Sequence, residues 1–227
     1  MRNANKDAIQ KTKVAIIGAG FGGLAMAIRL LQSQINDFVI LEKTNDVGGT
    51  WRENQYPGAA CDVQSHMYSL SFAPKTDWSK RYAEADEIFT YIQDITEQYK
   101  LKDYCKFNHE VIHAQFDENR NVWTVEFKDQ PTLEAQFVIF ASGPLHVPQI
   151  PHIKGIEKFK GKVFHSSKWE HDYDLSGKSV ASIGTGGSAI QYIPEIAPEV
   201  KQLYVFQRTA AWVIPRDERK YSQLSKT

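Results

Sequence analysis

The chain has 227 residues, which is enough for one large or two small domains. Its 27 Lys and Arg residues balance its 27 Asp and Glu residues to a formal net charge of +0, which excludes the basic surface typical of nucleic-acid-binding proteins. A hydrophobic content of 42% excludes a disordered chain. The two cysteines, Cys61 and Cys105, are too few for a disulfide framework and form no C-x-x-C pair. We also expect no metal site.

The stretch Lys13–Glu42 reads as a strand, a glycine turn, a helix and a second strand. Its strands are the runs Val14–Ile17 and Phe38–Leu41, which are continuously apolar as buried parallel strands require. After the turn, apolar residues recur at helical spacing: Leu24, Ala27, Ile28 and Leu31. The stretch therefore predicts a βαβ unit of the kind that binds dinucleotides.

The turn itself carries the spacing G-x-G-x-x-G at Gly18, Gly20 and Gly23. The first glycine allows a sharp turn, the second lets the backbone approach a pyrophosphate, and the third lets the helix pack closely on the strand. The N–H groups at the start of the helix then face the phosphate oxygens. Glu42 follows Gly23 by 19 residues, close to the position of an acid that binds a ribose 2′-OH.

A signal peptide is the alternative interpretation of this region. Lys11 and Lys13 precede fifteen uncharged residues, Val14–Ile28. That run is too short to span a membrane, and Arg29 and Leu30 follow it where a cleavage site would need small residues. We therefore expect a cytoplasmic protein without a membrane span.

The middle of the chain predicts a loop, a helix and a small sheet. Residues 43–72 are rich in both turn formers and aromatic residues, which is typical of an ordered binding loop. Glu84–Lys100 has the apolar spacing of an amphipathic helix. Three strands are then expected, at His109–Phe116, Asn121–Phe127 and Leu133–Phe140, as an antiparallel meander whose last strand joins the main sheet.

A proline-rich segment, residues 144–153, indicates a semi-rigid connector between domains. A short strand is expected after it, at Lys162–His165. We place the first domain at residues 1–150 and a second, incomplete domain at residues 151–227. The predicted fold class is α/β, with two Rossmann-like dinucleotide-binding domains.

The second unit repeats the first. Lys178–Ile183 is an apolar strand, G-x-G-x-x-A follows, and a helix is expected at Gly187–Ile196, before a strand at Leu203–Phe206. Arg208 follows Ala189 by 19 residues, as Glu42 follows Gly23.

By this spacing, Glu42 of the first unit corresponds to Arg208 of the second, so the same position holds an acid in one unit and a base in the other. An acid suits a free ribose 2′-OH, whereas an arginine suits a 2′-phosphate, which Thr209 could also bind. The first site is therefore predicted to take FAD or NAD and the second NADP, with electron transfer between them. The alternative is that Arg208 is an ordinary surface arginine.

With both units considered, the sequence resembles the flavin-containing monooxygenases, and most closely the Baeyer–Villiger monooxygenases. Four stretches carry the resemblance: GAGFGG at 18–23, GGTW at 48–51, YPGAACDVQSHMYSLSF at 56–72 and FKGKVFHSSKWE at 159–170. The last fits the family fingerprint through Phe159, Gly161, His165 and Trp169, and departs from it at Glu170. The simpler flavin monooxygenases usually have Tyr or Phe where Trp169 stands.

The resemblance implies which residues contact each cofactor. FAD is expected at Gly18, Gly20, Phe21, Gly23, Glu42, Gly49, Thr50, Trp51, Asp62, Tyr68 and Val111. NADP(H) is expected at Gly184, Thr185, Gly186, Gly187, Ser188, Ala189, Gln191, Arg208 and Thr209.

Asp62 is the candidate acid beside the flavin ring, and the alternative is an aspartate that caps its loop. The family usually has Arg where this chain has Ala60, so that contact is not carried over. His165 and Trp169 are expected to couple domain motion, or else to be a packed turn aromatic beside a satisfied histidine.

The reaction implied by the resemblance uses NADPH, FAD and O₂. NADPH delivers hydride to FAD, the reduced flavin captures O₂ as a C4a-peroxyflavin, and this attacks a ketone to give an ester or lactone. The expected partners are therefore a small ketone or related substrate and O₂. A C-terminal half is expected to be missing, since a doubly wound domain needs more strands after Arg208.

Two other functions stay open. One is an N- or S-oxygenating flavin monooxygenase, and the other is a truncated, non-catalytic nucleotide-binding remnant. A pyridine-nucleotide disulfide reductase is not expected, because it needs a redox cysteine pair.

Overall fold

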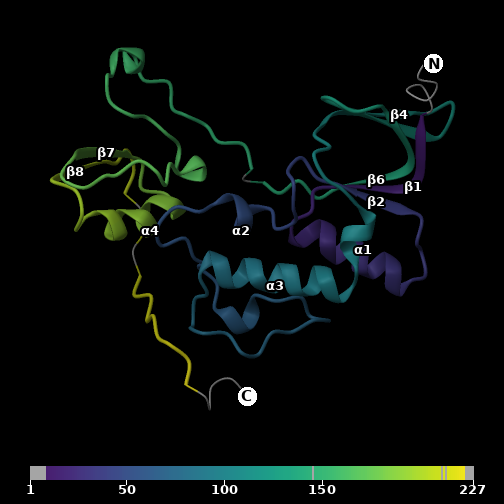
Figure 1. Ribbon diagram of the computed structural model, residues 1–227, viewed down its shortest axis with the longest axis horizontal. Coiled ribbons are helices and arrows are strands. Elements are labelled where there is room, and N and C mark those ends of the chain that lie inside the picture. The colour runs from purple at the N-terminus through teal and green to yellow at the C-terminus, as the bar shows by residue number, and fades with distance from the viewer. Residues whose placement is uncertain (1–8, 145, 211, 213, 223–227) are drawn as a thin grey trace. The chain divides into compact units, whose positions relative to one another are not determined.

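The computed structural model describes residues 9–144, 146–210, 212 and 214–222 (Figure 1). These residues form two compact units. The first comprises the described parts of Met1–Thr50 and Thr90–His146, and the second those of Trp51–Phe89 and Val147–Thr227. The boundary predicted between an FAD and an NADP domain, at residue 150, stays a prediction.

The first unit is built on a six-stranded sheet with the order β3-β2-β1-β6-β5-β4. The strands are β1 (Gln10–Ile17), β2 (Phe38–Leu41), β3 (Cys105–Lys106), β4 (Val111–Asp117), β5 (Val122–Phe127) and β6 (Leu133–Phe140). β1 lies parallel to both β2 and β6, whereas β4, β5 and β6 are antiparallel. The meander and its return into the main sheet are therefore confirmed.

β1 begins at Gln10, earlier than the predicted start at Val14. The apolar run Val14–Ile17 covers only the more buried half of β1. Its polar half forms a parallel ladder with β6, in which Gln10 lies opposite Leu133. Backbone hydrogen bonds to a neighbouring strand thus extend β1 beyond its hydrophobic signal.

Both faces of the central strands are buried. On one face Ala15, Val39 and Leu41 pack with residues of β5 and β6. On the other, Ile16 faces α1 (Phe21–Gln32), whose buried residues include Leu24 and Ile28. Figure 1 shows α1 beside β1 and β2. This double burial explains why β1 and β2 read as continuous apolar runs.

The long helix α3 (Ala85–Gln98) confirms the amphipathic helix predicted at Glu84–Lys100. Its residues Ile88, Ile92 and Ile95 are at most 3% exposed. It leads to η2 (Leu101–Tyr104), a 3-10 turn before β3.

The second unit contains a two-stranded parallel sheet of β7 (Ser179–Ile183) and β8 (Gln202–Phe206), joined by α4 (Gly187–Ile196). The described part of this unit also contains short elements. They are α2 (Thr50–Glu53), which starts at the last residue of the first unit, and the 3-10 turns η1 (Ser65–Met67), η3 (Ile156–Lys158) and η4 (Ser166–Lys168).

The strand predicted at Lys162–His165 is wrong. These residues are irregular and lead directly into η4. In the described part of the second unit β7 and β8 pair only with each other, so no neighbouring strand satisfies the backbone of this segment.

Candidate functional site

The first glycine turn follows β1 and is shaped by two close contacts. The Gly18 N–H donates to the carbonyl oxygen of Leu41 at 2.8 Å, and Gly18 has a φ of +108°. A Cβ atom at Gly18 would lie 2.6 Å from the carbonyl oxygen of Ala141, and one at Gly23 would lie 1.9 Å from that of Gly18. The turn therefore requires glycine at both positions.

The Glu42 side chain points into this turn. Its residue is only 6% exposed, and its Oε2 accepts a hydrogen bond from the Ala19 N–H at 2.9 Å. Its Oε1 accepts from the backbone N–H and the hydroxyl of Thr44, at 2.9 and 2.8 Å. A carboxylate has about four lone-pair sites, so Glu42 can still accept one hydrogen bond from a ligand hydroxyl.

A second glycine pair lies against the first turn. Gly48 donates its N–H to the carbonyl oxygen of Ala19 at 3.0 Å. A Cβ atom at Gly49 would lie 3.0 Å from the Cα of Gly20, and Gly49 has a φ of +54°. The backbone of the GGTW stretch thus approaches the turn closely, as its assignment to the same cofactor requires.

Two other residues of the predicted FAD set have packing partners. Phe21 begins α1, and its ring centroid lies 6.0 Å from that of Tyr91. Val111, at the start of β4, packs against the hydrophobic core of the first unit.

The second glycine turn has the same construction as the first. The Gly184 N–H donates to the carbonyl oxygen of Phe206 at 2.8 Å, and Gly184 has a φ of +100°. The Ile190 N–H donates to the Gly186 carbonyl at 3.1 Å, as the equivalent groups do at the start of α1. The sequence repeat is therefore also a repeat of backbone geometry.

The strand pairing shows which residue of the second unit corresponds to Glu42. Leu41 accepts the hydrogen bond from the first turn, and Glu42 is the next residue; Phe206 accepts the equivalent bond, and Gln207 is the next residue. Gln207 therefore holds the position that equal spacing assigns to Arg208, which lies one residue further on.

Gln207 also contacts its own turn, but as a donor, whereas Glu42 accepts from the Ala19 N–H. The Gln207 Nε2 donates to the Thr185 hydroxyl at 3.1 Å. Arg208 and Thr209 follow it and are exposed to solvent. The second turn is thus lined by neutral groups, with a cation just beyond the end of β8.

Three glycines of the second turn border open space. A Cβ atom at Gly184, Gly186 or Gly187 would meet no atom within 4 Å. Ser188 is half-buried, and Ala189 is buried, where the first unit has a glycine. The first N–H groups of α4 lie at this open end, which is the arrangement that binds a pyrophosphate.

The structure also pairs two residues of the predicted flavin region. The Trp51 indole Nε1 donates to the Tyr68 hydroxyl at 3.1 Å, and the two rings meet edge to face at 5.5 Å between centroids. Burial raises the pKa of the Tyr68 hydroxyl, which therefore stays protonated at neutral pH.

Gln191, for which an NADP(H) contact stays a prediction, makes four hydrogen bonds to protein groups. Its Oε1 accepts from the Tyr56 hydroxyl at 3.0 Å and from the Ala60 N–H at 3.2 Å. Its Nε2 donates to the Ala60 carbonyl at 2.9 Å and to Asp62 Oδ1 at 3.2 Å. The side chain thus holds residues 56–62 against α4.

Arg216 is a contact of Asp62 that the sequence did not reveal. Its Nη2 donates to the Cys61 carbonyl oxygen at 3.3 Å, and its Nη1 lies 4.0 Å from Asp62 Oδ1. Its guanidinium also lies over the ring of Tyr82, 4.7 Å from the centroid. More than 150 residues separate Arg216 from Asp62, and a lone arginine in a polar segment gave no signal.

The fingerprint residues are packed within the second unit. His165 Nδ1 accepts from the Ser167 N–H at 3.1 Å and caps η4. The Trp169 ring lies 5.3 Å from the rings of both Phe164 and Tyr192. These contacts match a packed turn aromatic beside a satisfied histidine.

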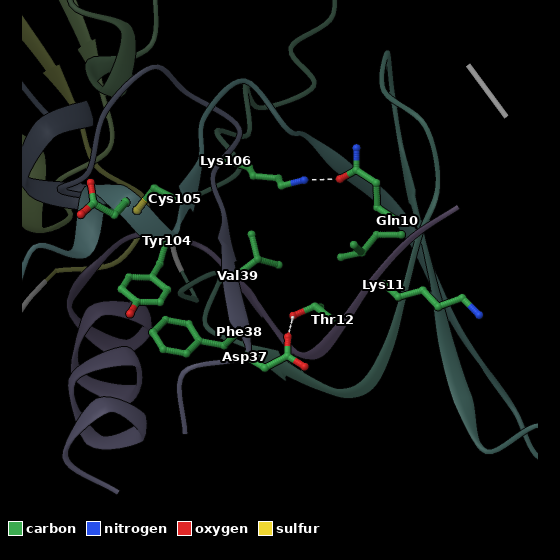
Figure 2. A pocket seen from close by; sticks show the side chains of 11 residues that line it. Gln10, Lys11, Thr12, Asp37, Phe38, Val39, Tyr104, Cys105 and Lys106 are labelled. Carbon is green, nitrogen blue, oxygen red and sulfur yellow. Dashed lines mark hydrogen bonds between the residues drawn. The ribbon is translucent and has the colours of Figure 1, made fainter. Parts of the chain in front are cut away.

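Figure 2 shows a cavity of the first unit, with a volume of about 360 Å³. Its lining includes Gln10 and Thr12 at the start of β1, and Asp37 and Phe38 at the start of β2. Lys106 reaches across to hydrogen-bond the Gln10 amide oxygen. Since the glycine turn follows the carboxyl ends of these strands, this cavity is separate from the candidate site.

In the part of the chain that the structure describes, no helix has the length and apolar character needed to cross a bilayer. The same residues contain no group of three or more His, Cys, Asp or Glu side chains that could hold a metal ion.

Comparison with known proteins places these features in a family. A model of the flavin-binding monooxygenase-like family matches residues 11–222. The chain is similar to a Baeyer–Villiger monooxygenase of Streptomyces coelicolor, with 48% identity over 94% of this chain and 41% of the relative.

Two solved structures are similar to the chain. One is OTEMO in complex with FAD and NADP, with a TM-score of 0.88 and 34% identity, over 95% of this chain and 42% of that one. The other is a cyclohexanone-bound cyclohexanone monooxygenase, with a TM-score of 0.84 and 32% identity, over 95% and 42% respectively. The chain thus spans about two fifths of the length of these proteins. Because the family model covers nearly all of the described residues, the chain belongs to the flavin-binding monooxygenase-like family.

Proposed function

We propose that this chain is part of a cytoplasmic FAD- and NADPH-dependent monooxygenase of the Baeyer–Villiger type. The observation that carries the proposal is the pair of glycine turns with the same backbone geometry and different strand-end groups. A buried carboxylate closes the first turn, and a neutral glutamine followed by Arg208 closes the second. The named relatives support the oxygenation chemistry.

In this proposal FAD occupies the first turn. The residues there fit its adenosine end: Glu42 keeps a free lone pair for a ribose hydroxyl, and the start of α1 offers N–H groups to the pyrophosphate. The backbones of Gly20 and Gly49 pack closely at this turn, where a Cβ atom at Gly49 would lie 3.0 Å from the Gly20 Cα.

NADP(H) occupies the second turn. The open space over Gly186 and Gly187 admits a pyrophosphate, and Arg208 and Thr209 would hold the 2′-phosphate. Gln207 stands where Glu42 stands in the first turn, so no carboxylate repels the phosphate.

When bound, the flavin would take hydride from NADPH and supply the oxygen-activating chemistry. The residues of this chain would bind and orient the nucleotides and keep water from the reacting ring. Trp51 and Tyr68 form a hydrogen-bonded, edge-to-face aromatic pair. Burial raises the pKa of the Tyr68 hydroxyl, so the hydroxyl is protonated. Asp62, 62% exposed at its side chain, is the candidate acid in this proposal.

The substrate class proposed is a small ketone, which would be converted to an ester or lactone. The fingerprint tryptophan, Trp169, favours this class over oxygenation of nitrogen or sulfur. Since the chain spans only about two fifths of its relatives, turnover is proposed for a longer protein that contains this chain.

The test begins with the purified chain and added FAD. We expect weak binding, seen as a small change in the flavin absorbance spectrum, and little NADPH oxidation. The same assay on a version extended through the following reading frame is expected to show tight FAD and ketone-stimulated NADPH oxidation.

Three results would change the proposal. Preferential oxidation of an amine or sulfide would select a heteroatom oxygenase. FAD binding without reduction by NADPH in the extended version would indicate a non-catalytic remnant. Tight FAD binding with NADPH oxidation by the short chain would refute the need for a longer protein.

A further inference from the structure

The side-chain amide of Gln191 makes four hydrogen bonds within the second unit. The residue is 8% exposed, and its four hydrogen bonds equal the capacity of an amide, which has two acceptor lone pairs and two N–H donors. All four reach residues 56–62, about 130 positions earlier in the chain.

A second, independent contact holds the same loop on α4. Gly58 has a φ of +74°, and a Cβ atom there would lie 2.9 Å from the Gln191 carbonyl and 2.8 Å from Glu195 Cγ. The Tyr56 ring also meets that of Tyr192 edge to face, at 6.2 Å between centroids. The backbone of the loop therefore rests directly on the helix.

The oxygen and the nitrogen of the Gln191 amide bind different groups. Its oxygen holds the loop, through the Tyr56 hydroxyl and the Ala60 N–H. Its nitrogen reaches the Asp62 carboxylate, at 3.2 Å, as well as the Ala60 carbonyl. Only a side chain of this length with both donors and acceptors makes all four contacts.

We infer that Gln191 is a positioning residue that orients the carboxylate of Asp62. Gln191 lies on α4, whose first residues border the open second glycine turn. The same helix therefore carries the proposed pyrophosphate-binding N-terminus and the side chain that orients Asp62. The inference rests on the proposed function for the importance of Asp62 to the reaction. The orientation itself is a property of the chain without cofactors.

The experiment uses the full 227-residue chain without FAD or NADP(H). Two readouts are taken: hydrogen exchange at the Ala60 amide, and the ¹³C signal of the Asp62 carboxyl group in protein labelled at aspartate, assigned with Asp62→Asn. The variants are Gln191→Leu, which removes all four hydrogen bonds, and Gln191→Glu, which keeps the acceptors and removes the donors.

In Gln191→Leu, exchange at Ala60 is expected to rise about tenfold, as loss of its acceptor predicts, and the Asp62 signal moves. The Cys61 amide, which donates to the Ala83 carbonyl at 2.9 Å, keeps its protection and serves as the internal reference. Gln202→Leu, the same change at an exposed glutamine of β8, alters neither readout.

Gln191→Glu separates positioning from simple packing. Ala60 should stay protected, because a carboxylate oxygen still accepts from it, while the Asp62 signal moves because its donor is gone. If Gln191→Leu also raises exchange throughout β7 and β8, the substitution has unfolded the second unit. The test then depends on Ala60 exchange and the Asp62 signal in Gln191→Glu.

An Asp62 signal that stays unchanged in both Gln191 variants would overturn the inference, as would unchanged exchange at Ala60 in Gln191→Leu. Neither readout needs a cofactor, so a failed FAD titration counts against the proposed function alone.

Discussion

Glu42 is a buried carboxylate whose three protein donors make it a structural group as well as a candidate ligand. We expect Glu42→Ala to lower the free energy of unfolding by about 2–3 kcal/mol, since the N–H groups of Ala19 and Thr44 lose a charged acceptor. Urea denaturation measures this. The control is Glu110→Ala, whose carboxylate faces Lys128 on the surface at 3.6 Å and should contribute less than about 0.5 kcal/mol. Equal effects of both substitutions would contradict this role.

Cys105 gives the chain a pH dependence with a definite sign. Burial, and then the nearby Glu42 carboxylate, raise the pKa of its thiol from 9.0 to about 12. As pH rises above 9, the unfolded chain releases this proton first, so the free energy of unfolding falls until pH reaches about 12. Below 9 the thiol is protonated in both states and contributes no slope.

Urea denaturation at pH 8 and pH 10 of the wild type and of Cys105→Ala tests this sign. Other groups titrate in both proteins, so only the difference between them reports on the thiol. Between pH 8 and pH 10 the wild type is expected to lose about 1.4 kcal/mol more than the variant in total, most of it above pH 9. Identical pH dependences would show that the thiol titrates normally.

At the scale of elements, local sequence patterns predict the bounds of strands and helices, but they do not predict contacts between residues far apart in the sequence. The strands Phe38–Leu41 and Leu133–Phe140 and the helix Gly187–Ile196 have their predicted bounds, since a buried face repeats with a fixed period. Gln191 and Arg216 were not placed beside Asp62, because no periodicity encodes a contact across more than 120 residues. Equal spacing from the glycine turn also does not predict Gln207, because the second strand of the second unit is shifted by one residue relative to that of the first.

The two glycine turns predict opposite outcomes for the same substitution. Gly23→Ala would put a Cβ atom 1.9 Å from the Gly18 carbonyl oxygen, so we expect it to destabilise the chain by more than about 3 kcal/mol. Gly186→Ala meets no atom within 4 Å and has a φ of −77°, so its cost should be below about 1 kcal/mol.

Nucleotide binding then distinguishes the two. Gly186→Ala is expected to weaken NADP⁺ binding at least about tenfold, measured by calorimetry on the chain, because the new methyl group occupies the approach to the pyrophosphate. Thermal unfolding of the same samples confirms that the fold is kept. Unchanged NADP⁺ affinity would remove this turn from the nucleotide site.

At the scale of the whole molecule, each unit carries one glycine turn, and each keeps exposed apolar surface. In the first unit Phe137 and Phe140 of β6 are 52% and 61% exposed. In the second, Tyr204 and Phe206 of β8 are 52% and 57% exposed, on a sheet of two strands. A two-stranded sheet with an open apolar face is marginal by itself and tends to pair with other chains.

We therefore expect the 227-residue chain to self-associate as its concentration rises, as measured by sedimentation velocity. Tyr204→Lys places a charge on the exposed face of β8 and should shift the chain towards the monomer. Gln202→Lys adds the same charge to the same strand, two residues away, but removes no apolar surface. If charge alone prevents association, both variants will be monomeric; if the apolar face drives it, Tyr204→Lys will have the larger effect. Association that neither variant reduces would place the contact elsewhere, with the aromatic face of β6 the next surface to change.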